Sequence, residues 1–230
     1  MGAVDIIICR VFQKEVTVED YSELIKRCKD KEKEAVIKGI AMGAVILSRM
    51  GPIYMKGSVR TFQDLAVQFS LKLTSTTTTS EFDCFHESFV EAVQSHIRGK
   101  DGGDLSYGEA QKSINVFLKH YVDRSGLRDG ATAKKVRPFL HVPLDSVVIR
   151  YFRENYPQSY EKHILPEHRK INEQFKAAHP EAVKIPDRLL SELKYIFQEV
   201  YLAWQNWFRE ILPEKPVLLD TIWSLEREID

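Results

Sequence analysis

The sequence predicts an all-α protein, with about eight helices around one core and at most a short strand near the N-terminus. Apolar residues recur at the three- and four-residue spacing of amphipathic helices in most segments between residues 17 and 211. Strand-like patterns are confined to the first dozen residues and the threonine run at 74–80. At 230 residues, the chain is long enough for one helical domain, 1–230, or for two helical subdomains with an active-site cleft between them.

Four helices are expected in the N-terminal half. A capping-box pattern starts the first helix at Thr17, and the charged run 29–34 separates it from an apolar second helix that ends near Gly51. A third helix is expected from Thr61. The fourth starts at Ser80, and it carries the clearest apolar stripe, formed by Phe82, Phe85, Phe89, Val93 and Ile97.

Four more helices are expected in the C-terminal half. The first covers 109–123 and follows a glycine-rich turn, and the second starts at Asp145. The segment 157–186 is polar and interrupted by prolines, which predicts an irregular insertion with one helix near 166–178. The last helix lies within 187–212 and has a wide apolar face.

Composition excludes several classes of protein. The 33 Lys and Arg residues balance 33 Asp and Glu residues, so any nucleic-acid binding must use a local basic patch. Cys9, Cys28 and Cys84 share no C-x-x-C spacing, which argues against a disulfide scaffold, a structural zinc site or an iron–sulfur cluster. The apolar runs are too short for a signal-peptide core or a membrane span. We therefore expect a cytoplasmic protein with reduced thiols and no membrane partner.

Common catalytic motifs are absent from the sequence. No dinucleotide-binding, P-loop, zinc-protease, serine-hydrolase, EF-hand or zinc-deaminase pattern is found. Three histidines, His163, His168 and His179, lie in the polar segment, but their spacing matches no known ligand set. The sequence therefore predicts no metal and no cofactor.

Lys112 is the first candidate catalytic residue. On an ideal helix it lies about 160° from Ile114, so the default interpretation is a lysine in solvent. Val116, however, shares the face of Lys112 one turn later, which makes that face partly apolar. The first turn of a helix is also an unfavourable place for a cation, and it favours the neutral, nucleophilic amine.

Asp145 is the second candidate. It stands between "PFLHVPL" and "SVVIRYF", and Pro143 disfavours helix immediately before it. An N-cap, with a contribution of about 1 kcal/mol, is the natural assignment. The carboxylate of a capping residue can also face a cleft, so capping and catalysis are compatible.

Two segments, "AQKSINVFLKHYV" and "FLHVPLDSVVI", resemble the second half of a helix-hairpin-helix DNA glycosylase, most of all the archaeal 8-oxoguanine DNA glycosylases. Members of that family have a catalytic lysine in a Gln-Lys pair near a helix start and a catalytic aspartate further on, in a Pro-x-Asp context. Gln111-Lys112 and Pro143-Leu144-Asp145 match both halves, and the two candidates are 33 residues apart. The resemblance covers about residues 105–150.

The resemblance implies an enzyme that excises a damaged or modified base from double-stranded DNA and has AP lyase activity. Such an enzyme must extrude the base from the duplex into a pocket. Asp145 would stabilise the positive charge that develops on the sugar, and Lys112 would attack C1′ to give a Schiff base.

The same resemblance implies contacts to the substrate and to DNA phosphates. Gln111, His141 and Trp223 are the expected substrate contacts, and Trp223 is available to stack on the extruded base. Trp204 and Trp207 lie on the apolar face of the last helix and are expected in the core. The DNA phosphates would be held by a local basic patch. Its expected members are Arg98, Lys100, Lys134, Lys135 and Arg137.

Two other functions stay open. The chain could be a non-catalytic helical factor that binds protein or nucleic acid, in which case Lys112 and Asp145 lie far apart or open to solvent. It could also be a metal-dependent hydrolase or nuclease that uses His141 and Asp145. The distance between the Lys112 amine and the Asp145 carboxylate separates the first alternative from the glycosylase.

Overall fold

The computed structural model describes residues 18–123, 130–178 and 192–222. Within these ranges the chain forms nine α-helices and four short 3-10 helices. The same ranges contain no strand, only isolated bridges at Tyr54–Gly99 and Arg98–Asp104. The all-α prediction is confirmed, and the strand expected in the first dozen residues lies outside the described residues.

The N-terminal half contains three long helices where the sequence predicts four, and the helix predicted at 109–123 follows them. The predicted first and second helices form one helix, because the charged run 29–34 is rich in Lys and Glu, which are good helix formers. The next helix begins before the expected Thr61, after Gly57 with its left-handed φ of 95°. Thr78 and Glu81, rather than Ser80, form the capping box of the following one. The elements are α2 (Val18–Leu47), α3 (Ser58–Lys72), η1 (Leu73–Ser75), α4 (Thr79–His96) and α5 (Tyr107–Asp123).

The C-terminal half contains shorter helices. The sequence predicts an irregular insertion at 157–186, but two helices occupy residues 157–178 of it, and the first begins at Pro157, a favoured first-turn position. Residues 179–186 lie outside the described residues. The elements are α6 (Gly130–Val136), η2 (Arg137–Phe139), α7 (Ser146–Asn155), α8 (Pro157–His163), α9 (Leu165–Ala178), η4 (Leu193–Tyr195), α10 (Gln198–Ile211) and η5 (Pro216–Thr221).

The chain divides into two compact units, Met1–Val36 and Ile37–Asp230. In the first unit, the described side chains of α2 are almost all exposed, including the apolar Tyr21, Leu24 and Ile25. The second unit holds the remaining elements and every described candidate for the functional site. The site can therefore be described within this unit alone.

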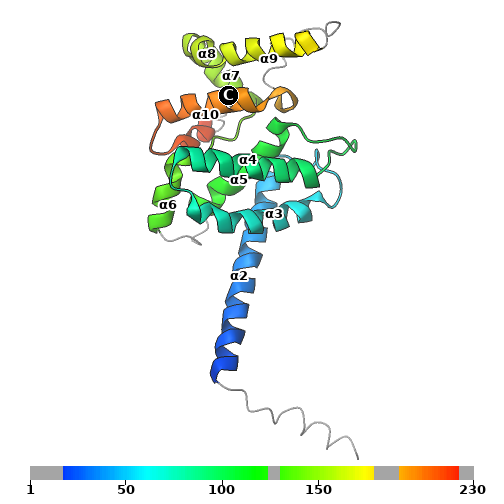
Figure 1. The fold of residues 1–230 in the computed structure, drawn as a ribbon, viewed down its shortest axis with the longest axis vertical. Coiled ribbons are helices and arrows are strands. Elements are labelled where there is room, and N and C mark those ends of the chain that lie inside the picture. The colour runs from blue at the N-terminus through cyan, green and yellow to red at the C-terminus, as the bar shows by residue number, and fades with distance from the viewer. Residues whose placement is uncertain (1–17, 124–129, 179–191, 223–230) are drawn as a thin grey trace, which may run out of the picture. The chain divides into compact units, whose positions relative to one another are not determined.

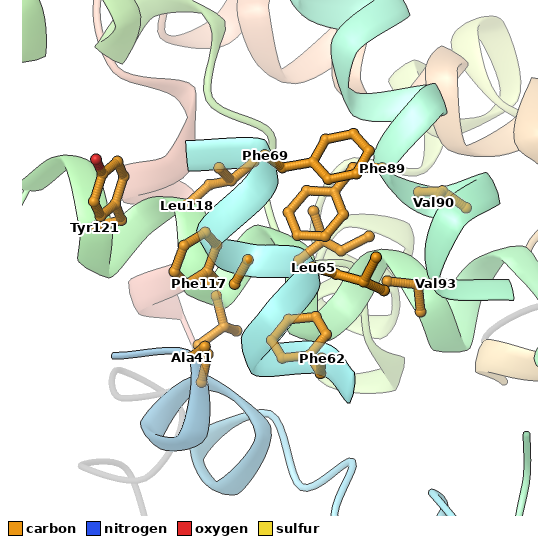
Figure 2. Close-up of a cluster of buried hydrophobic side chains, with 14 of the residues drawn as sticks. Ala41, Phe62, Leu65, Phe69, Phe89, Val90, Val93, Phe117, Leu118 and Tyr121 are labelled. Carbon is orange, nitrogen blue, oxygen red and sulfur yellow. The ribbon is translucent and has the colours of Figure 1, made fainter. Parts of the chain in front are cut away.

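The larger hydrophobic cluster of the second unit is formed mainly by aliphatic and aromatic side chains of α3, α4 and α5 (Figure 2). The rings of Phe69 and Phe89 stack with their centroids 4.3 Å apart, and Phe62 meets Phe117 edge to face at 6.3 Å. Full burial of such a side chain contributes about 1.5–3 kcal/mol. The stripe predicted for α4 is confirmed, since all its members are buried: Phe82, Phe85, Phe89, Val93 and Ile97.

A second hydrophobic cluster is formed by α7, α8, α10 and the non-helical segment 142–144, where the sequence predicts one core or two helical subdomains. Figure 1 shows α10 between the α4–α5 pair and the helices α7 to α9, and it contacts α5, α8 and α9. Trp204 and Trp207 are buried in this cluster, as the sequence predicts. Tyr107 and Leu193 pack against both clusters, so the start of α5 and η4 join them.

Gly108, in the first turn of α5, allows η4 to approach the helix backbone. A Cβ atom at this position would lie 2.1 Å from the carbonyl oxygen of Leu193 and 2.8 Å from Cβ of Ile196. We expect Gly108→Ala to lower the free energy of unfolding by about 3 kcal/mol, measured by urea denaturation. Gly39→Ala in α2 is the matched control, because a Cβ there meets nothing within 4 Å, and it should stabilise by about 0.5–1 kcal/mol. Equal effects of the two substitutions would contradict this role of Gly108.

Candidate functional site

Lys112 and Asp145 form an ion pair between α5 and the N-terminus of α7. The Nζ atom of Lys112 lies 3.2 Å from Oδ2 of Asp145. The two side chains are 14% and 25% exposed, so both are shielded without being sealed from solvent. This is the arrangement that the glycosylase hypothesis expects, and it differs from the distant or solvent-exposed arrangement expected of a non-catalytic factor.

The Asp145 carboxylate also caps α7. Its Oδ1 atom accepts hydrogen bonds from the backbone N–H groups of Val147 and Val148, each at 3.0 Å. These bonds and the positive end of the helix dipole stabilise the carboxylate anion. Because Oδ1 is held by the helix, Oδ2 is left to face Lys112. The same side chain therefore caps α7 and pairs with Lys112.

Gln111 holds the chain segment that carries Asp145. Residues 140–144 are buried although they lie outside any helix, so their backbone polar groups need partners inside the protein. The Gln111 amide donates to the carbonyl of Leu144 at 3.0 Å and accepts from its N–H at 3.3 Å. Gln205 of α10 makes the equivalent pair of bonds with Val142, at 3.0 and 2.8 Å. Gln111, expected to contact substrate, is fully buried and places Asp145 beside Lys112.

His141 does not join Lys112 and Asp145. Its imidazole is buried, and its Nδ1 atom lies 2.8 Å from the Tyr201 hydroxyl. Asn115 donates to that hydroxyl at 2.7 Å, and the oxygen of the Asn115 amide accepts from Nε2 of His86 at 2.8 Å. The hydroxyl proton of Tyr201 is then left for Nδ1 of His141.

The opposite side of the His141 ring meets an ion pair. With Nδ1 as an acceptor, Nε2–H of His141 donates to Oδ1 of Asp83 at 2.8 Å. Arg209 of α10 donates to both oxygens of the same carboxylate, at 2.5 and 3.2 Å. A continuous polar network thus runs from α5 through the buried histidine to the surface of α4.

Burial sets the ionisation of this network. It lowers the pKa of His141 to about 4 and the pKa of His86 well below its ordinary value. Burial likewise raises the pKa of Tyr201 well above its ordinary value. Burial alone would raise the pKa of Asp83, but hydrogen bonds from His141 and Arg209 lower it to about 2. At neutral pH the imidazoles and the phenol are neutral, and Asp83 and Arg209 carry the charges.

A second ion pair lies near Lys112 and Asp145. The Nζ atom of Lys119, also on α5, is 2.6 Å from Oδ2 of Asp220, and the two side chains are 12% and 14% exposed. Burial raises the pKa of Asp220, the charges of Lys119 and Lys112 lower it, and the negative charge of Asp145 raises it further. Asp220 is therefore within electrostatic reach of both candidate catalytic residues.

No family model, curated protein or solved structure matches the chain. The assignment of a function therefore depends on the residues of this chain and on their geometry.

The expected DNA-binding residues lie in two parts of the chain, the turn that follows α4 and the segment formed by α6 and η2. Arg98 pairs with Asp104 at 2.6 Å, and Lys100 is exposed in the same turn. Lys134 and Lys135 are exposed on α6, whereas Arg137 pairs with Asp123 of α5 at 2.7 Å. Trp223, the expected stacking residue, lies outside the described residues.

Two further observations concern metals and membranes. In the described parts of the chain, no group of three or more His, Cys, Asp or Glu side chains could hold a metal ion. His179 lies outside these parts. Over the same residues, no helix combines the length and the apolar character that a membrane crossing requires.

Most of the buried network was not predicted from the sequence. A signal was present, because His86 lies on the apolar stripe of α4 between Phe82 and Phe89, and Asn115 follows Gln111 by four positions on α5. A polar residue in the apolar stripe of a helix indicates a buried hydrogen bond. Its partners in α10 and in the segment 140–144 are distant in sequence and leave no such signal.

Proposed function

We propose that the protein is a DNA glycosylase/AP lyase, with Lys112 as the nucleophile and Asp145 as the carboxylate that stabilises the reacting sugar. The observation that carries this proposal is the 3.2 Å contact between Lys112 Nζ and Asp145 Oδ2, made by residues 33 positions apart. An amine and a carboxylate held together in a shielded site are the two groups that a lysine-dependent base excision requires.

The surroundings of the pair support a fixed geometry. The helix N-terminus fixes one oxygen of Asp145, and Gln111 fixes the backbone immediately before it. Lys112 follows Gln111 directly on α5, so both reacting groups are anchored to the same helix. Such anchoring reduces the reorganisation needed when positive charge develops on the sugar.

The chemistry balances with these two groups and water. Nζ of Lys112 gives a proton to water, and its lone pair forms a bond to C1′ of the extruded nucleotide. Asp145 stays ionised and stabilises the positive charge that develops on the sugar. The C1′–N bond breaks, and its electron pair leaves with the base, which takes up a proton. Opening of the sugar ring then gives an imine between Lys112 and C1′, which borohydride reduces to a stable amine.

Borohydride trapping tests this proposal. We expect the wild-type protein to form a covalent adduct with at least one duplex of a panel that carries 8-oxoguanine, uracil, hypoxanthine or an abasic site. Lys112→Gln should form none, because the nucleophile is gone, and Asp145→Asn should slow trapping by about 10²-fold or more. Lys162→Gln, an exposed lysine of α8, is the matched control and should trap at the wild-type rate.

Failure of the wild-type protein to trap any duplex of the panel would reject the proposal, as would an adduct formed by Lys112→Gln. The non-catalytic binding factor would then be favoured. One observation already supports it as a second candidate, because Tyr21, Leu24, Ile25 and Cys28 are all exposed along α2 of the first unit.

A further inference from the structure

A cavity of about 240 Å³ adjoins the C-terminal half of α5. Three cations line it: Lys119 of α5, Arg137 of η2 and Lys215, which immediately precedes η5. The rest of its wall is formed by Asp123, Val217, Leu218 and Thr221. A cavity of this size, with basic side chains from three separate elements, can hold a small anionic group.

Carboxylates hold these cations in position without using all their donors. Asp123 accepts from Nε of Arg137 at 2.7 Å and from Nζ of Lys215 at 2.6 Å, and Lys119 is held by Asp220 at 2.6 Å. In the described part of the chain, each cation uses one nitrogen in these pairs, so the terminal amino groups of Arg137 and further N–H groups of the lysines remain for a ligand. Three cations and two carboxylates leave one net positive charge.

The ionisation of Asp123 is consistent with its position between Arg137 and Lys215. Burial would raise its pKa, but hydrogen bonds from Lys215 and Arg137 together lower it below its ordinary value. Asp123 therefore stays ionised at neutral pH and keeps Arg137 and Lys215 on either side of it. The cations are pre-organised, which lowers the entropic cost of binding an anion.

The cavity is connected to the candidate catalytic pair through α5. Lys112 and Lys119 are seven residues apart on this helix, which corresponds to about 10 Å along its axis. Asp220, the partner of Lys119, is within electrostatic reach of both Lys112 and Asp145. Since phosphates of one DNA strand follow each other at about 3.4 Å along the helix axis, a strand bound at Lys112 extends over this distance within a few nucleotides.

We propose that this cavity binds a backbone phosphate of the DNA strand that reacts at Lys112, with Arg137, Lys215 and Lys119 as its ligands. The inference rests on the proposed function for the identity of the strand. It adds Lys119 and Lys215 to the DNA contacts expected from the sequence, and it assigns the bound phosphate as a ligand of Arg137. The bound group is a phosphate, and the experiment distinguishes a DNA phosphate from free inorganic phosphate.

The test is equilibrium binding of a duplex that carries a reduced abasic site, measured by fluorescence anisotropy between 50 and 200 mM salt. Arg137→Gln and Lys215→Gln should each weaken binding about tenfold near 0.1 M salt and reduce the slope of log K against log salt by about 1. Arg60→Gln removes the same charge from an exposed position on α3 and should change neither quantity. Thermal unfolding of each variant verifies that it is folded, and two independent variants keep the test valid if one is not.

The outcomes separate this inference from the proposed function. If both cavity variants are folded and bind the duplex with the affinity and salt slope of the wild type, the inference is overturned, even if borohydride trapping succeeds. Calorimetric binding of inorganic phosphate that is lost in Arg137→Gln, without any change in DNA affinity, would also overturn it and would assign the cavity to free phosphate. Weakened DNA binding by both variants, with no trapping by the wild-type protein, would support the phosphate site and reject the glycosylase.

Discussion

Replacing Asp83 by alanine is expected to lower the free energy of unfolding by about 3 kcal/mol at pH 7. Asp83 accepts hydrogen bonds from both terminal nitrogens of Arg209, whose side chain is 13% exposed. The Nε atom of Arg209 is buried and has no hydrogen-bond partner among the described residues. Without Asp83, the shielded guanidinium loses its carboxylate, and its other contacts, Oδ1 of Asn206 at 3.2 Å and Nε2 of His141 at 2.6 Å, carry no negative charge.

The expected loss is at the lower end of the range for a buried pair. Asp83 lines a cavity of about 320 Å³, through which water can reach the unpaired groups. Asp83→Asn separates charge from hydrogen bonding, because the amide oxygen still accepts from Nε2 of His141 but no longer neutralises Arg209. We expect the free energy of unfolding of Asp83→Asn to lie between those of the wild type and of Asp83→Ala.

A matched surface pair provides the control for Asp83. Asp64 of α3 pairs with Lys38 at 2.7 Å, but these side chains are 50% and 31% exposed. Asp64→Ala should therefore cost less than about 1 kcal/mol. Urea denaturation followed by circular dichroism measures both variants. If Asp83→Ala is as mild as Asp64→Ala, the network around His141 does not stabilise the fold.

The helices that could be predicted from the sequence are those with one dominant apolar stripe. On α4 the predicted inward residues are buried, because the period of an α-helix and the location of the core together determine which side chains lose contact with water. The charged run 29–34 is predicted to separate two helices. It ends the apolar stripe but not the helix, since Lys and Glu cover an exposed helix without weakening its backbone hydrogen bonds.

The candidate site was predictable only in part. Lys112 and Asp145 were identified through local context, and they lie in contact. Sequence patterns could not show that Gln111 and Gln205 bind the backbone of the segment 142–144, because such bonds join residues that are 33 and 63 positions apart. The pair Lys119–Asp220 spans 101 positions and was missed for the same reason.

Acidification from pH 6.5 to pH 4.5 is expected to destabilise the protein through His86 and His141. Burial holds the pKa of His141 at about 4 in the folded state, and it holds that of His86 well below its ordinary value of 6.5. At pH values between the pKa of such a histidine in the folded chain and its pKa in the unfolded chain, the unfolded chain binds more protons than the folded one. The free energy of unfolding therefore falls as the pH falls. At about 1.4 kcal/mol per pKa unit, His141 alone removes about 2–3 kcal/mol by pH 4.5.

Asp83 and Asp220 add no loss of stability in this pH window. Glu81, whose pKa is lowered by hydrogen bonds from Thr77 and Thr78, begins to lose its stabilisation only near pH 4.5. The pKa of Asp83 is lowered to about 2, so its stabilisation is present above pH 3.8 and is lost only below that value. Burial raises the pKa of Asp220, so its protonation relieves a cost and acts in the opposite direction. Neither Asp83 nor Asp220 therefore accounts for a net loss of stability between pH 6.5 and pH 4.5, and we assign most of this loss to the buried histidines.

His86→Gln tests the assignment of this loss to the buried ring. The glutamine amide can still donate to the oxygen of Asn115 but takes up no proton in this range. We expect the variant to be less stable than the wild type at pH 7 and to lose less stability on acidification, so that the difference between them narrows by pH 4.5. Urea denaturation at pH 7.0, 5.5 and 4.5 measures this difference. Parallel pH profiles of the two proteins would show that the His86 ring does not resist protonation in the fold, because only a depressed pKa couples its titration to unfolding.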